Sequence, residues 1–151
     1  MLFHAGYDTI LDEIIYAGDF VVSEHDLLPE PFVSNFEIRH MDLKENEFLI
    51  DSLAAKRIYN MRPRNSYGNQ FAIAVDGKPA FTGYFWSSRS RFRCDWYQIP
   101  TIVVHDSIQR NGKDKAFQIY LGERDGQILV NDLPYPPELI EAFRSSGRLI
   151  E

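Results

Sequence analysis

The sequence contains a single cysteine, Cys94, among 151 residues. One thiol cannot form an internal disulfide, and the same count excludes the all-cysteine patterns of zinc ribbons. Long apolar runs are also lacking, because no stretch approaches the ~20 residues that span a bilayer. The first 20 residues contain four acids and no lysine or arginine, unlike a secretory signal. We therefore expect a reduced, cytoplasmic protein without a membrane segment.

The overall composition is close to that of an average globular domain, with 44% hydrophobic and 25% charged residues. Aromatic residues are more abundant than usual at 14%, which favours a β-rich core. The length fits one domain, so we expect residues 1–151 to form a single unit. The net charge of −6 argues against nucleic acid as a partner.

This net charge conceals an uneven distribution along the chain. Residues 1–55 contain twelve acids and two bases, whereas residues 56–124 contain twelve bases and five acids. Residues 125–151 are acidic again, with five acids and two bases. Such an asymmetry predicts polarised surfaces if these segments also separate in space. The alternative is that the acidic segment folds over the basic one and neutralises it.

Helical periodicity occurs in three places: residues 8–17, residues 52–61, and the segment that follows Pro136-Pro137. In the first, apolar residues recur at spacings of three and four, which places them on one stripe of a helix. Asp51 is suited to cap the second helix, because its carboxylate can accept from free N–H groups of the first turn. Gly147 is placed to end the third helix.

Strand periodicity dominates the middle of the chain. Residues 70–75 and 78–86 alternate, and Asp76-Gly77 between them is a dipeptide typical of type I′ turns. We expect a two-residue hairpin with Val75 opposite Lys78, Ile73 opposite Ala80 and Ala72 opposite Phe81. Further expected features are strands over 35–43 (with a bulge near His40), 91–99, 101–108, 116–121 and 128–130, and a turn at Asn111-Gly112.

These elements predict the fold class. Short connections between neighbouring strands require antiparallel pairing. We expect an α+β domain built on one curved antiparallel β-meander, packed by an N-terminal, a middle and a C-terminal helix. A partly closed barrel is the alternative, since a curled meander hides its edges.

No group of residues predicts catalysis. Cys94 lies between aromatic residues in the apolar phase of a strand, where a thiol is an inert core side chain. His105-Asp106-Ser107 contains the residue types of a hydrolase triad, but neighbours on a strand point to opposite faces. The histidines are widely separated, and no glycine motif for phosphate binding is present. We expect no catalytic residue, metal site or cofactor, and lean against an enzyme.

A basic and aromatic segment from Tyr84 to Tyr97 is the first candidate binding surface. Arginines interleaved with aromatic rings are typical of protein-interface anchors and of platforms for single-stranded nucleic acid. The candidate contact residues are Trp86, Arg89, Arg91, Arg93 and Tyr97. The alternative is plain core with a solvated strand face. On a concave sheet, a small-molecule or hydrolytic cup would be lined by Tyr84, Trp86, Arg91, Arg93, Asp95 and Tyr97.

The acidic first third is the second candidate surface, with Glu24, Asp26 and Glu30 as contacts to a basic partner. We interpret the chain as a non-enzymatic protein-binding module of the type of small acidic inhibitors and bacterial immunity proteins. Its partner would be another protein, such as a basic enzyme or toxin. The alternatives are the cup described above and a homo-oligomer in which the same residues form the subunit contact.

Overall fold

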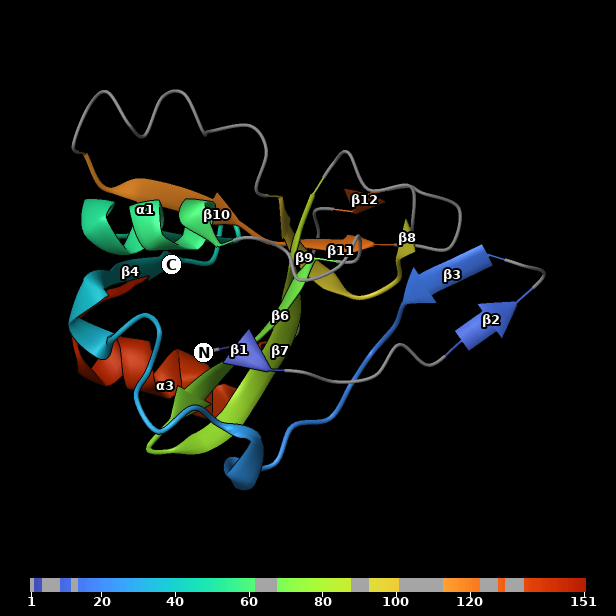
Figure 1. Cartoon of the computed structure of the whole chain (residues 1–151). Coiled ribbons are helices and arrows are strands. Elements are labelled where there is room, and N and C mark those ends of the chain that lie inside the picture. The colour runs from blue at the N-terminus through green and yellow to red at the C-terminus, as the bar shows by residue number, and fades with distance from the viewer. Residues whose placement is uncertain are drawn as a thin grey trace.

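The computed structural model has a mixed α and β architecture (Figure 1). It describes residues 2–3, 9–11, 14–61, 68–87, 93–100, 113–122, 128–129 and 135–151. The helices in this part of the chain are η1 (Glu24–Asp26), η2 (Asn35–Glu37), α1 (Ser52–Asn60) and α3 (Pro137–Ser145), where η denotes a 3₁₀ helix. No helix among the described residues is long and apolar enough to cross a membrane.

The described strands form three sheets. The six-stranded sheet has the order β1 (Leu2–Phe3), β6 (Asn69–Val75), β7 (Lys78–Trp86), β9 (Tyr97–Pro100), β11 (Tyr120–Gly122) and β12 (Ile128–Leu129). The four-stranded sheet has the order β10 (Lys115–Gln118), β5 (Glu47–Ile50), β4 (Ile38–Asp42) and β13 (Leu149–Ile150). The three-stranded sheet consists of β2 (Thr9–Leu11), β3 (Ile14–Ala17) and β8 (Arg93–Cys94). These strands do not close into a barrel.

The hairpin of β6 and β7 confirms the strongest local prediction. Asp76 and Gly77 have φ angles of 49° and 79°, and two positive φ values are what a type I′ turn requires. Val75 pairs with Lys78 across the turn, as predicted. The turn therefore fixes where the two strands start to pair.

Bulges change the register further along both hairpins. In β6 and β7 the register shifts between Ile73 and Ala74, so Ile73 lies opposite Phe81 and not opposite Ala80, and Ala72 lies opposite Thr82. In β4 and β5 the register shifts just before His40, where the alternation of the sequence predicted it. A bulge adds one residue to one strand, which increases the local twist.

The middle and C-terminal helices are confirmed. A carboxylate oxygen of Asp51 accepts hydrogen bonds from the N–H groups of Leu53 and Ala54, at 2.9 and 3.3 Å, and so caps α1. Helix α3 begins at Pro137, and Gly147 follows its end with a φ of 69°.

The predicted N-terminal helix over residues 8–17 is wrong. The described residues of this segment are strands β2 and β3, which pair antiparallel with Ile10 opposite Ile15 and Leu11 opposite Ile14. The apolar spacing that predicted a helix also fits two short strands. The β-branched residues Thr9, Ile10, Ile14 and Ile15 favour the strand conformation, and pairing with β8 supplies hydrogen bonds that a local pattern cannot reveal.

The single antiparallel meander is also wrong. Strands β7 and β9 pair in parallel, with Tyr84 opposite Gln98, because the chain makes a crossover through β8 before it returns to the sheet. The predicted strand over 91–99 breaks at Asp95-Trp96 into β8 and β9. The strand over 116–121 breaks at Ile119 into β10 and β11, which join different sheets. The predicted strand over 101–108 and the turn at Asn111-Gly112 lie outside the described residues.

One core joins the two larger sheets and the two described α-helices. In Figure 1, α1 and α3 lie on the side of the four-stranded sheet, and the three-stranded sheet lies on the opposite side. The shared core contains Met41, Phe48, Ile50, Ala54, Ile58, Phe71, Phe81, Phe85, Tyr97, Ile99, Phe117, Ile119, Leu139 and Phe143. A smaller cluster of Ala17, Tyr84, Trp86 and Cys94 packs against the other face of β7. Alternation along β7 therefore supplies apolar side chains to both clusters.

Gly122 is predicted to be intolerant of a side chain. A Cβ atom at this position would lie 1.8 Å from the carbonyl oxygen of Cys94, and this backbone atom would have to shift to make room for it. We expect Gly122→Ala to lower the free energy of unfolding by about 1–3 kcal/mol, the usual cost of overpacking. Urea denaturation of Gly122→Ala and of Ala116→Ser, an exposed control on β10, measures this, and equal stability of the two variants would contradict the packing described here.

Candidate functional site: an acidic strap over an apolar cleft

Residues 18–34, which we call the strap, connect β3 to η2 and cross in front of β7 and α3 in the view of Figure 1. Pro29 and Pro31 explain why the second half of this segment lacks regular structure, since proline lacks an N–H and disfavours helix at the residue before it. The strap carries four acids and no lysine or arginine. Its two ends are held by different contacts.

The start of the strap is fastened to the face of β7 that carries the smaller cluster. The hydroxyl of Tyr84 donates to the carbonyl of Gly18 at 2.9 Å, and the hydroxyl of Thr82 donates to the carbonyl of Phe20 at 3.4 Å. The ring of Phe20 meets the ring of Tyr84 edge-on, with centroids 5.1 Å apart. These contacts attach an otherwise irregular segment to a regular strand.

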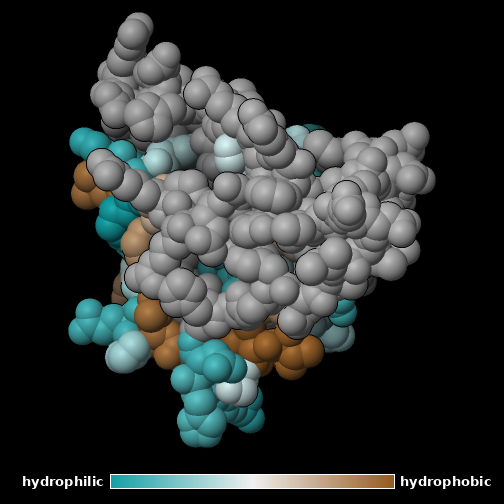
Figure 2. Space-filling model, turned by 45° about the vertical axis from the view of Figure 1, so that its right-hand side comes forward, coloured by the Kyte–Doolittle hydropathy of each residue, from teal (hydrophilic) through white to brown (hydrophobic). Residues whose placement is uncertain are grey.

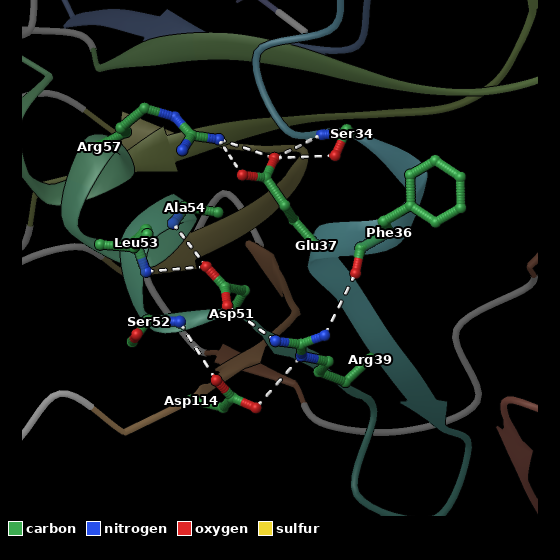
Figure 3. Close-up of polar contacts among 10 residues, drawn as sticks. All are labelled: Ser34, Phe36, Glu37, Arg39, Asp51, Ser52, Leu53, Ala54, Arg57 and Asp114. Carbon is green, nitrogen blue, oxygen red and sulfur yellow. Dashed lines mark hydrogen bonds and ion pairs between the residues drawn. The ribbon is translucent and has the colours of Figure 1, made fainter.

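The end of the strap is held by Glu37 (Figure 3). The N–H and the hydroxyl of Ser34 donate to the Glu37 carboxylate at 2.8 and 3.0 Å, and the Arg57 guanidinium donates to both of its oxygens at 2.8 and 2.7 Å. Arg57 also donates to the carbonyl of Phe32 at 3.0 Å. Partial burial alone would raise the pKa of Glu37, but the hydrogen bonds from Arg57 and Ser34 together hold that pKa below its usual value.

Beside Glu37, Arg39 bridges two carboxylates from different parts of the chain. Its guanidinium lies 2.8 Å from Asp51, which also caps α1, and 3.3 Å from Asp114. Arg39 also approaches the carbonyl of Phe36 at 3.5 Å, and the ring of Phe36 points away from this network in Figure 3. Phe36 is 85% exposed, so an aromatic ring stands on a turn whose backbone is well fixed.

Arg148 holds the turn that ends the strap from the other side. Its guanidinium donates to the carbonyl and side-chain oxygens of Asn35, both at 2.7 Å, and to the carbonyl of Ile38 at 2.8 Å. Its Nε donates to the Ser146 hydroxyl at 3.0 Å, and the guanidinium carbon lies 5.3 Å from the centroid of the Phe143 ring. Arg148 carries no local signal of this role in the sequence, because Asn35 and Ile38 lie 113 and 110 positions away.

Between these anchors, the strap borders an apolar cleft of about 660 Å³. The other walls come mainly from β6 and α3, with contributions from η2, β4, β5, α1, β7, β9 and the residues after α3. The volume lies in the range typical of small-molecule sites. The apolar lining includes Leu27, Leu28, Val33, Ile38, Phe48, Ile50, Ile73, Val75, Leu139 and Phe143. The polar lining residues are Asn35, Asp76, Ser145, Ser146 and Arg148.

The predicted acidic contacts lie on the outside of the strap. Glu24, Asp26 and Glu30 are all exposed, on η1 and the residues after it. The side-chain and backbone hydrogen bonds from Ser23, at 2.6 and 2.8 Å, lower the pKa of Asp26, so this carboxylate is both charged and fixed in position. Figure 2 shows hydrophilic residues projecting beside hydrophobic ones at the lower margin of the molecule, where η1 lies in Figure 1.

Two of the predicted contacts in the basic and aromatic segment, Trp86 and Tyr97, are buried. Trp86 and Tyr97 are only 7% and 8% exposed, and each packs in one of the two clusters. Arg89 and Arg91 lie outside the described residues, and only the backbone of Arg93, in β8, is described. The tryptophan and the tyrosine thus contribute to packing, with little surface available to a partner.

The cup predicted from the same segment does not coincide with the cleft. None of its members with a described side chain, including Tyr84 and Asp95, lines the cleft. The alternation of residues within a single strand could not predict where the cleft lies. The cleft is bordered by β6, α3 and the strap, which are distant in sequence. Among the described side chains, no group of three or more histidine, cysteine or carboxylate residues is placed to hold a metal ion.

Cys94 is a core residue, as predicted from its position between aromatic residues. Burial raises the pKa of its thiol to about 12, and the thiol donates to the carbonyl of Trp96 at 3.6 Å. A thiol with this pKa is almost entirely protonated at neutral pH, and the thiolate is the nucleophilic form.

Comparison with protein-family models, with curated proteins and with solved structures found no match.

The thiol of Cys94, in the smaller cluster, is expected to react slowly in the folded protein. Because its thiol is buried and its pKa is high, we expect alkylation by iodoacetamide at pH 7.5 to be at least about 100-fold slower in the folded protein than in urea. Mass spectrometry over time measures both rates. Equal rates in the two conditions would contradict the packing of the smaller cluster.

A second prediction concerns the pH dependence of stability at the end of the strap. The pKa of Glu37 is lowered on folding, so its stabilising effect is present above its ordinary pKa and is lost as the pH falls through the folded pKa. We expect Arg57→Met to cost up to about 1 kcal/mol at pH 7, since both partners are partly exposed, and less as the pH falls below about 4. Lys56→Met, an exposed position of the same helix, is the control. Denaturant titrations at several pH values measure the difference, and a pH-independent loss would contradict the ion pair.

Proposed function

We propose that this protein is a non-enzymatic protein-binding module that docks a basic partner protein through the acidic outer face of its strap. Small acidic inhibitors and immunity-type proteins bind basic enzymes or toxins by this kind of charge complementarity. The observation that carries the proposal is that the strap has four acids and no lysine or arginine, with Glu24, Asp26 and Glu30 all exposed.

Two further features of the strap support the proposal. Val21 is 95% exposed, so an apolar side chain lies among the acids of the strap. Interfaces combine apolar contacts, which favour a bound state, with charges that steer the encounter. The strap is also held at both ends, which lowers the ordering cost that a free loop would incur on binding.

The test compares two matched charge reversals. Glu24→Lys/Glu30→Lys changes the strap, and Glu45→Lys/Glu138→Lys makes the same change in net charge at exposed positions elsewhere. Each protein is used as bait in a lysate of the source organism at low salt, and a recovered partner is then purified. We expect the partner to bind the wild type and the control variant, and to associate about tenfold more slowly with the strap variant.

Kinetics by surface plasmon resonance at two salt concentrations give the association rate. Equal association rates of the two variants would contradict docking on the strap, as would the absence of any stoichiometric partner. The homo-oligomeric alternative would be favoured if the wild type elutes as a defined oligomer and the strap variant elutes as a monomer. Light scattering during gel filtration decides this point.

A further inference from the structure

Arg148 differs from the other arginines with described side chains. Arg39, Arg57 and Arg144 each contact at least one carboxylate within 3.3 Å. Arg148 instead donates only to neutral oxygen atoms of Asn35, Ile38 and Ser146 in the described structure. Neutral acceptors hold the guanidinium in place without cancelling its charge, so a fixed positive charge remains at this position.

This charge lines the apolar cleft. Arg148 and Ser146 belong to its walls, and most of the remaining walls are aliphatic and aromatic side chains. Asp76 is the one carboxylate among the lining residues, and it lies at the exposed tip of the hairpin of β6 and β7. The acids of the strap do not line the cleft, although Leu27, Leu28 and Pro29 of the same segment do. The cleft therefore pairs an apolar interior with one fixed cation.

We propose that the cleft binds an amphiphilic carboxylate, such as a fatty acid, with its hydrocarbon chain among the apolar walls and its carboxylate on the guanidinium of Arg148. The inference goes beyond the proposed function and does not depend on it. Apolar walls favour burial of a hydrocarbon chain but do not discriminate between head groups. The guanidinium provides selectivity for an anionic head group, because hydrogen bonds from a charged donor to a carboxylate are about twice as strong as neutral ones.

Arg148 has one N–H group that none of its four described hydrogen bonds uses. A guanidinium has five N–H groups, and the four hydrogen bonds to neutral oxygen atoms use four of them. The ring of Phe143, against which the guanidinium packs, is itself a wall of the cleft. A cation already fixed beside the apolar wall loses little conformational freedom when it binds an anion.

The decisive experiment varies the ligand and leaves the protein unchanged. Laurate, dodecanol and dodecyltrimethylammonium have the same hydrocarbon chain with an anionic, a neutral and a cationic head. Isothermal titration calorimetry of the full chain, below the aggregation concentration of each ligand, gives the three affinities. We expect saturable binding of one laurate, about tenfold tighter than dodecanol, and the weakest binding for the cation.

Other outcomes would overturn the inference. Equal affinities would show an apolar site without a contribution from Arg148. Tightest binding of the cation would show that the acids of the strap control the cleft. Absence of saturable binding of laurate would mean that the cleft is not a site for this class of ligand. None of these results bears on docking of a basic protein, which the charge-reversal variants test separately.

Substitutions then locate the site. Ala142 is a half-buried wall residue on α3, so Ala142→Trp is expected to fill the cleft and abolish binding of laurate. Ala116→Trp, on the exposed face of β10 and away from the cleft, is the matched control and should bind as the wild type does. Arg148→Met should remove the preference for laurate over dodecanol, and Arg148→Lys should restore part of it. Unchanged binding by Ala142→Trp would place the ligand elsewhere and contradict the inference.

Discussion

The guanidinium of Arg148 joins three parts of the molecule that the sequence keeps far apart. Its hydrogen bonds to Asn35 and Ile38 span 113 and 110 positions, and link η2, which follows the strap, and the start of β4 to the end of α3. The carbonyl of Arg148 accepts from the N–H of Met41 at 2.9 Å, where β13 begins to pair in parallel with β4. One residue therefore connects η2, β4 and the end of α3 beside the cleft.

The strap gives the molecule two chemically different surfaces from one segment. Its outer side carries exposed carboxylates, and the side chains of Leu27 and Val33 face the cleft that β6 and α3 complete. The uneven charge along the sequence is thus partly a property of the surface, since the strap acids remain exposed. The neutralising alternative also holds in part, because Glu37 of the acidic segment is paired with Arg57 of the basic segment. The two proposals concern opposite sides of the strap, so either can fail without the other.

Local chemistry predicted the elements whose signals are local. The positive φ angles of Asp76 and Gly77, the capping carboxylate of Asp51 and the burial of Cys94 all follow from one residue and its near neighbours. The predictions that were wrong concern elements whose structure depends on strand pairing between segments distant in sequence. Residues 9–17 satisfy helical and strand spacing alike, and only pairing with β8 decides between them. The parallel contact of β7 with β9 and the role of Arg148 leave no trace in hydrophobic periodicity, so the cleft was beyond prediction.

The anchored strap and the fixed charge in the cleft both depend on the hydrogen bonds that hold Arg148 in place. Heteronuclear NMR of the arginine Nε–Hε groups, with Arg148 assigned by its substitution to lysine, observes this side chain without altering the wild-type protein. We predict a dispersed Nε–Hε signal for Arg148 with slow exchange against solvent, since this group donates to Ser146 within a network of four hydrogen bonds. A signal at the position of free arginine, with equally fast exchange, would contradict the anchored strap and the fixed charge in the cleft.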